Sequence, residues 1–484
     1  MKLYKLKAFE LINLIKRKEI SVKEVVESFF DRVNKVESKV DAFLHLYQER
    51  ATEQAIKADE RIKKGEKIRA LEGIPMVLKD NILSKGDKTT AASKMLENYV
   101  APYDATVVEK LKEAGSIIIG KATLDEFAMG SSGEYSAFKL AKNPWDLTRV
   151  PGGSSSGSTA CVAANMSPLA LGSETGGSVR QPAAFCGVVG LKPSYGRISR
   201  YGLITFASSL DQIAPLAQDV RDIALTMNVI AGHDEKETTS AKVSVPNYLD
   251  SLDKDIKGIK VGILKKELLS GADKEILDEY ERTYKILEGL GAIIEEIEIK
   301  DINYSIEVYF TINPSEVSSN LARLDGLKYG LAPKDPKTLS EIYNYSRANG
   351  FGQEVKRRIM IGNFVLSADH YESYYIKACK VRNIIKQSFN DVFRKVDVVL
   401  MPTTPTKAFK FGENTNDPVK MYLSDMFTIP ANLTGNAAIS VPTTIKNGLP
   451  IGMQFIANNF EEALLLKVAH AFERERGSLE EPNL

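Results

Sequence analysis

The segment from Pro151 to Pro182 constrains the fold more than any other part of the chain. It reads PGGSSSGSTACVAANMSPLALGSETGGSVRQP, with two turns rich in glycine and serine at Gly152–Ser158 and Thr175–Ser178. A run of small residues and a short apolar run lie between the two turns. Glycine allows positive φ and lets another chain or a ligand approach the backbone, and consecutive exposed N–H groups can bind an anion. The pattern predicts a helix and a strand between two backbone cradles, with serines as candidate nucleophiles.

Patterns on the N-terminal side of this segment predict alternating helices and strands. An apolar run at 73–80 reads as a buried strand that ends near Lys79, and a helix at 104–115 precedes a strand at 116–119. Ser21 and Glu24 have the spacing of a capping box, which predicts a helix start. Thr123 and Glu126 have the same spacing and predict another helix start. Such alternation is typical of an α/β protein with a parallel or mixed sheet.

The same alternation continues to the end of the chain, so we expect a single domain over 1–484. Its expected parts are an N-terminal helical segment at roughly 1–70 and a catalytic core at roughly 71–231. A helical elaboration with the substrate-pocket half is expected at roughly 260–484. No repeat, low-complexity tract or long linker interrupts these parts.

Composition limits the classes of function. Of 484 residues, 43% are hydrophobic and 26% charged, with a formal net charge of +1, which gives no support to a chain that wraps nucleic acid by itself. The three cysteines are widely spaced and match no zinc or disulfide pattern, which favours a reducing compartment. No apolar run fits a signal peptide or a membrane span. We therefore expect a cytoplasmic protein that does not contact a membrane.

Two familiar uses of a glycine/serine turn fit poorly. A P-loop requires lysine directly before Ser or Thr, and Gly157-Ser158-Thr159 has none, so only phosphate binding by the backbone remains. A hydrolase elbow would place Ser155 at the centre of Gly153–Gly157, and it also requires a histidine. The four histidines lie in helical or polar stretches without site-like neighbours: His45, His233, His370 and His470.

A serine activated by lysine is the third possibility. Burial lowers the pKa of lysine from about 10.4, which turns it into a base; Lys79 at a strand end could serve, although most lysines turn to solvent. Ser178 and Gln181 have capping-box spacing, so Ser178 could simply begin a helix. The same helix start, after Gly176 and Gly177, directs N–H groups at a ligand as an oxyanion hole would. Spacing alone leaves the structural and catalytic interpretations open.

The stretch GGSSSGS…ALGSETGGSVRQPA, with GIP-x-x-x-Lys-Asp upstream, resembles the signature of the amidase family. The resemblance implies an α/β fold with a large mixed sheet covered on both faces by helices. It also implies a catalytic triad in which Ser154 is the nucleophile, Ser178 is a bridging serine after a cis peptide bond from Gly177, and Lys79 is the base. The oxyanion would be bound by backbone N–H groups around Thr175, Gly176 and Gly177.

Further stretches, among them EFAMGSS, NPWDLTRVPGGSS, SSLDQIAPL, FGQEVKRRIMIG and MYLSDMFTIPANL, resemble the branch of that family formed by glutaminase subunits of tRNA-dependent amidotransferases. The resemblance implies L-glutamine as substrate. Arg358 would bind its α-carboxylate, Asp425 its ammonium group, and Tyr309 would line the pocket. A carboxylate fits a guanidinium through two hydrogen bonds, whereas Arg358 could also be a solvated helix charge and Asp425 a helix cap.

The resemblance also implies partners, the B and C subunits of an amidotransferase heterotrimer. The first would bind the misacylated tRNA and use ATP and Mg²⁺, and the second, which is small, would help to hold the complex together. No cofactor and no metal are expected in this chain itself. Two alternatives remain: a free-standing amidase for small amides, and a non-enzymatic module that binds phosphate or a nucleotide on the two turns.

Overall fold

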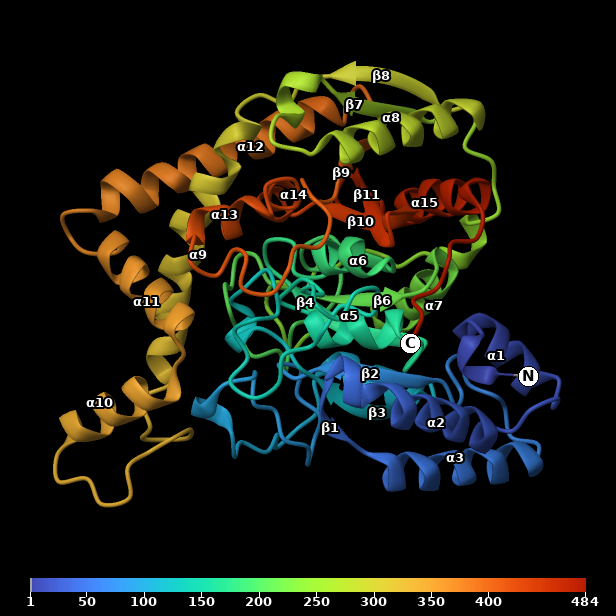
Figure 1. Ribbon diagram of the computed structural model, residues 1–484, viewed down its shortest axis with the longest axis horizontal. Helices are drawn as coiled ribbons and strands as arrows, with labels where there is room; N and C mark the ends of the chain where they lie inside the picture. Colours follow the sequence, from blue (N-terminus) through green and yellow to red (C-terminus); the bar gives the residue numbers. More distant parts are fainter. Residues whose placement is uncertain (1) are drawn as a thin grey trace.

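The computed structural model describes residues 2–484, and over these residues eleven strands form one mixed sheet (Figure 1). In spatial order the strands are β1 (Phe43–Leu46), β3 (Ile117–Ala122), β2 (Pro75–Lys79), β4 (Leu169–Glu174), β6 (Gln212–Ala217), β5 (Val189–Lys192), β10 (Ala437–Lys446), β11 (Leu449–Ala457), β9 (Val398–Pro402), β7 (Lys260–Leu264) and β8 (Ile293–Ile297). Two parallel groups, β3-β2-β4 and β9-β7-β8, lie on either side of an antiparallel centre. Strands from the expected catalytic core and from the C-terminal half therefore share one sheet.

Fifteen α-helices accompany the sheet within the same residues. They are α1 (Ala8–Lys16), α2 (Val22–Val40), α3 (Gln48–Lys63), α4 (Thr106–Glu113), α5 (Ser156–Ala163), α6 (Arg180–Cys186), α7 (Val220–Ile230), α8 (Lys274–Gly289), α9 (Ser305–Asn320), α10 (Leu339–Gly350), α11 (Gln353–Val365), α12 (Lys377–Val392), α13 (Pro418–Leu423), α14 (Ile429–Thr434) and α15 (Glu462–Arg476). None of these helices combines the length and the apolar character needed to cross a lipid bilayer.

Helices cover both faces of the central strands, as the family resemblance implies. Helices α5 and α6 contact each other; α5 packs on β4 and α6 packs on β10 and β11. A second row, α7, α15 and α8, packs against β6, β10 and β9. Helices α9 to α12 form a separate group along one side of the molecule, on the left of Figure 1, and α1 to α3 lie at its lower right.

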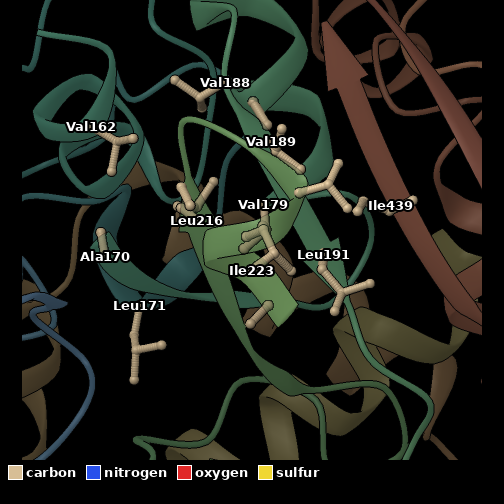
Figure 2. Close-up of a cluster of buried hydrophobic side chains, with 14 of the residues drawn as sticks. Val162, Ala170, Leu171, Val179, Val188, Val189, Leu191, Leu216, Ile223 and Ile439 are labelled. Carbon is tan, nitrogen blue, oxygen red and sulfur yellow. The ribbon is translucent and has the colours of Figure 1, made fainter. Parts of the chain in front are cut away.

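Buried aliphatic side chains hold the central strands and their helices together. Figure 2 shows a part of this core, which draws side chains from α5, β4, β6 and α7: Val162, Ala170, Leu171, Leu216 and Ile223. All of these residues are fully buried. Because burial of one such aliphatic side chain contributes about 1.5–3 kcal/mol, this core provides a rigid base for the two turns that flank β4 and α5.

Most of the elements expected from the sequence are present. Ser21 accepts a hydrogen bond from the Glu24 N–H at the start of α2, which confirms that capping box. The helix predicted from Thr123 and Glu126 is wrong, because only a single 3₁₀ turn forms at Glu126–Ala128 and Phe127 has φ of 49°. Both expected capping side chains bond elsewhere: Thr123 donates to the carbonyl of Lys139, and Glu126 accepts from Ser93.

Candidate active site

Lys79 and the two glycine/serine turns meet where neighbouring strands end. Lys79 is the last residue of β2, which pairs in parallel with β4, so the carboxyl ends of both strands lie at one edge. The turn before α5 and the turn between β4 and α6 both border this edge. The Ser155 N–H donates to the carbonyl of Ser178 at 3.1 Å, which ties the two turns together.

The Lys79 ammonium group is fully buried and contacts three oxygens. Its Nζ lies 2.8 Å from Ser154 Oγ, 2.9 Å from Ser155 Oγ and 3.1 Å from the carbonyl oxygen of Ser173. Burial lowers the pKa of Lys79 to about 7, although the buried carboxyl groups of Asp125, Asp211 and Glu174 act in the opposite direction. The strand ends at Lys79 as predicted, and with a pKa lowered by burial Lys79 can exchange a proton near neutral pH.

The expected position of the cis peptide bond is wrong, and the contacts of Lys79 do not fit the expected order of the two serines. The cis peptide bond joins Gly153 to Ser154, whereas it was expected between Gly177 and Ser178. Lys79 contacts Ser154 directly, and within residues 2–484 no hydrogen bond joins it to Ser178. The physical reason is that both turns contain Gly-Gly-Ser, so the sequence does not show which serine faces the lysine.

Ser178 does not cap α6 either, so the predicted capping box is wrong. The helix begins at Arg180, and the carboxylate of Glu174 accepts hydrogen bonds from the N–H groups of Val179 and Arg180 at 3.1 and 3.0 Å. The guanidinium of Arg180 pairs with Glu174 at 2.5 Å in a fully buried ion pair. Ser178 is thereby left free of helix capping and is 8% exposed, whereas Ser154 is fully buried.

The backbone around Gly176 has the properties of an anion-binding cradle. The N–H groups of Gly176, Gly177 and Ser178 donate to no other backbone group within the described chain. The hydroxyl of Thr428 donates to the Gly176 carbonyl at 2.7 Å. Thr175 donates its hydroxyl to Asp211 at 2.7 Å, and this carboxylate also accepts from two backbone N–H groups of the preceding loop. The turn is therefore held from behind while its N–H groups remain available.

Arg358 is buried, which disagrees with a solvated helix charge. It lies on α11, and its Nε donates to Glu354 Oε1 at 2.8 Å. The rings of Phe206, Phe310 and Tyr422 surround its guanidinium at 5.6–5.7 Å from their centres. Although burial opposes the charge, Glu354 raises the pKa of Arg358 above its ordinary value, so Arg358 remains a cation.

Asp425 lies near the second glycine/serine turn and, when ionised, carries the charge opposite to that of Arg358. Its Oδ2 accepts a hydrogen bond from the hydroxyl of Ser131, and its buried Oδ1 has no partner within residues 2–484. Burial raises the pKa of Asp425 to about 7, while Ser131 and Arg358 act in the opposite direction. The carbonyl of Asp425 accepts from the same Thr428 hydroxyl that contacts Gly176, so this carboxyl group lies close to the second turn.

Tyr309 of α9 lies directly against the second turn. A Cβ atom on Gly176 would lie 2.7 Å from the phenol oxygen of Tyr309. Burial raises the pKa of Tyr309 well above its ordinary value, so its hydroxyl stays protonated and can donate a hydrogen bond. Tyr309 and Asp425 thus border the second turn, and Arg358 interacts electrostatically with both of them.

Comparison with known proteins agrees with this geometry. A family model described as Amidase matches residues 24–466. The chain belongs to the amidase family. Two curated relatives, both named as the A subunit of Glutamyl-tRNA(Gln) amidotransferase, come from Carboxydothermus hydrogenoformans and Sulfurihydrogenibium sp. They are 54% and 53% identical to this chain, with 98% of each chain covered.

Solved structures of the amidase family have the same fold. The crystal structure of the A subunit of Glutamyl-tRNA(Gln) amidotransferase from Thermotoga maritima is 42% identical, with a TM-score of 0.83, and covers 100% of this chain and 98% of that one. A 6-aminohexanoate cyclic dimer hydrolase complexed with substrate is 26% identical, with a TM-score of 0.84 and coverage of 99% and 98%. The fold class expected from the sequence is therefore confirmed.

Most of the side-chain contacts that hold this amidase site together are not identifiable from spacing. Ser155 contacts Lys79, Asp211 holds Thr175, Glu354 holds Arg358, and Ser131 contacts Asp425. In three of these four pairs the two residues are between 36 and 294 positions apart in the sequence. In the fourth pair, Glu354 and Arg358 lie one helical turn apart. Only that last pair has a local signal, since residues four apart on a helix share a face. Over residues 2–484, no three His, Cys, Asp or Glu side chains cluster in a way that could hold a metal ion.

Proposed function

We propose that this amidase-family chain is the glutamine-hydrolysing component of a tRNA-dependent amidotransferase. The observation that supports it most is a pair of buried, oppositely charged groups: Asp425, which lies at the second turn, and Arg358, which interacts with it electrostatically. An L-amino acid presents an α-carboxylate and an ammonium group at one end, and glutamine presents an amide at the other. The name shared by relatives at 51–54% identity points to the same activity.

Substrate binding follows from these charges. The guanidinium of Arg358 retains N–H groups beyond the one given to Glu354, and these would bind the α-carboxylate through charge-assisted hydrogen bonds. The unpartnered Oδ1 of Asp425 would bind the ammonium group. Binding of a cation favours the ionised form of Asp425, whose pKa is about 7 without substrate. Tyr309 would fill the space above Gly176 and donate a hydrogen bond.

The contacts of Lys79 favour Ser178 as nucleophile and Ser154 as the residue that relays its proton. A neutral lysine amine has two N–H bonds and one lone pair. The charged lysine can donate to all three oxygens, and in the neutral form we assign the two N–H bonds to Ser155 Oγ and the Ser173 carbonyl, which leaves the lone pair to accept the proton of Ser154. Ser154 is fully buried, whereas Ser178 is partly exposed and adjoins the available N–H groups.

The reaction then proceeds in two halves. Ser178 Oγ attacks the side-chain amide carbon of glutamine, and its proton passes through Ser154 to Lys79. The carbonyl oxygen becomes an oxyanion, which the N–H groups around Gly176 and Gly177 would bind. The C–N bond breaks as the proton returns to the leaving nitrogen, which departs as ammonia. Water then attacks the glutamyl ester of Ser178, with Lys79 again as base, and releases glutamate.

We propose that the amide-forming half of the reaction belongs to the B and C subunits of a heterotrimer. The first of them would bind the misacylated Glu-tRNA or Asp-tRNA and use ATP and Mg²⁺ to activate it, and the second would complete the assembly. The P-loop lysine is absent from the turn at Gly157–Thr159, and the net charge of +1 gives this chain no electrostatic basis for tRNA binding alone. The chain itself would hold neither nucleotide nor metal.

The test is ammonia release from glutamine by the chain alone and by the complex with both co-expressed partners. A parallel assay follows conversion of Glu-tRNA(Gln) to Gln-tRNA(Gln) with ATP and Mg²⁺. We expect glutamine hydrolysis that requires Ser178, and tRNA amidation by the complex. Equal hydrolysis of unrelated small amides without tRNA amidation would instead identify a free-standing amidase. If neither the chain nor the complex hydrolyses any amide, the remaining alternative is a non-enzymatic module that binds phosphate.

A further inference from the structure

Gln181 lies between the two ends of the substrate site. It is the second residue of α6, is fully buried, and uses both atoms of its amide group. Its Oε1 accepts a hydrogen bond from the Gly153 N–H at 3.0 Å, and its Nε2 donates to the carbonyl of Ser131 at 2.6 Å. A Cβ atom on Gly152 would lie only 2.4 Å from Gln181 Oε1, so the turn closes tightly over this amide.

The hydrogen bonds continue beyond Gln181 in both directions. Gly153 is bonded through its carbonyl carbon to Ser154, whose hydroxyl lies 2.8 Å from Lys79 Nζ. On the other side, the hydroxyl of Ser131 donates to Asp425 Oδ2, and the other carboxylate oxygen of Asp425 has no partner within the described residues. One buried side chain therefore links the carboxyl group assigned to the substrate ammonium with the turn that carries the proton relay.

We propose that Gln181 is a positioning residue that fixes the substrate ammonium group relative to the catalytic serines. This inference rests on the proposed function, because it assigns the ammonium group to Asp425. An amide meets both requirements at every pH, since Gly153 offers a donor and Ser131 offers an acceptor. Methionine has a similar shape and forms neither bond, and glutamate retains the acceptor but loses the donor when it is ionised.

The test compares two substrates in the complex with its co-expressed partners: glutamine, and glutaramate, which is glutamine without its α-amino group. In Gln181→Met, we expect kcat/KM for glutamine to fall by about tenfold or more, because a buried donor and acceptor lose their partners. The decrease for glutaramate should be at least roughly threefold smaller, because Asp425 has no ammonium group to bind in that substrate. Equal decreases for both substrates, or no decrease, would overturn the proposal.

Gln212→Met is the matched control, because Gln212 is also fully buried beside the site but donates to the carbonyl of Asp211. We expect it to change kcat/KM by the same factor for both substrates. Gln181→Glu serves if the methionine variant does not fold. The ratio of its activity to that of wild type should rise as pH falls, because a protonated carboxyl group again donates to the Ser131 carbonyl. A ratio that is the same at every pH would contradict the positioning role of Gln181.

The same data distinguish a failure of this inference from a failure of the proposed function. If the wild-type complex hydrolyses glutaramate as well as glutamine, Asp425 does not bind the ammonium group and the substrate-binding part of the proposed function is wrong, whereas loss of the glutamine-dependent tRNA amidation would overturn the proposed function itself. If the wild-type complex prefers glutamine and Gln181→Met retains that preference in full, only the role of Gln181 is wrong.

Discussion

The pKa of Lys79 leads to a quantitative prediction for the pH dependence of turnover. Lys79 accepts a proton only in its neutral form, and burial lowers its pKa to about 7. Activity is therefore present above this pH and is lost as pH falls through it. About nine tenths of the lysine is neutral at pH 8 and about one tenth at pH 6, so kcat should decrease about tenfold between them. If Lys79 had the ordinary lysine pKa of about 10.4, kcat would still rise about tenfold for each pH unit between pH 8 and pH 10.

The two kinetic constants report on different groups. At saturating glutamine the bound ammonium group keeps Asp425 ionised, so kcat reports Lys79 alone. The free enzyme must have both Lys79 neutral and Asp425 ionised, and the pKa of Asp425 is also about 7. We therefore expect kcat/KM to decrease about a hundredfold between pH 8 and pH 6.

Ammonia release measured from pH 5.5 to 10 gives both profiles. Enzyme returned to pH 8 after incubation at each pH controls for unfolding, and Lys79→Ala should lower kcat by about 10²–10⁴-fold at pH 8 and remove the decrease of kcat around pH 7. A wild-type kcat that does not level off by pH 9, or that is constant between pH 6 and 8, would refute the assignment of Lys79 as the base.

Two further substitutions test the substrate pocket and the second turn. Arg358→Ala should raise KM for glutamine about 10–100-fold with a smaller change in kcat, because charge-assisted bonds are worth about 1.5–3 kcal/mol; an unchanged KM in steady-state assays would contradict its role. Gly177→Ala should lower the free energy of unfolding by about 1–3 kcal/mol, because Gly177 has φ of 143° and a Cβ would lie 2.2 Å from Thr428 Oγ1. Gly289→Ala on α8 has no atom within 4 Å and should be neutral or slightly stabilising, and equal urea midpoints for the two variants would exclude the strain.

Local patterns in the sequence predict much of the fold, because local interactions determine helix starts and strand ends. The Ser21 capping box and the strand that ends at Lys79 are both present. The helix start predicted from Thr123 and Glu126 fails, because the carboxylate of Glu126 accepts from Ser93, 33 positions away. A capping box requires that both side chains turn back to their own backbone, and a distant partner overrides that preference.

In the candidate active site too, contacts between distant residues are not predictable from local sequence patterns. Motif resemblance brings together Lys79, Ser154 and Ser178, which the structure places at one sheet edge, but the order of the two serines depends on how the two Gly-Gly-Ser turns face β2. Gln181 has capping-box spacing from Ser178, yet its amide bonds with Gly153 and Ser131. These contacts join residues 28 and 50 positions apart, so no pattern of neighbouring residues contains them.

The measurement that tests the proposed mechanism most directly is the position of the glutamyl ester formed with glutamine. Trypsin leaves Ser154 and Ser178 in one peptide, because no lysine or arginine lies between Arg149 and Arg180, and cleavage after Glu174 separates the two serines. Mass spectrometry of the acid-quenched complex should detect the adduct on the peptide that contains Ser178, and Ser178→Ala should abolish it. An adduct on Ser154 would contradict the proposed roles of the two serines.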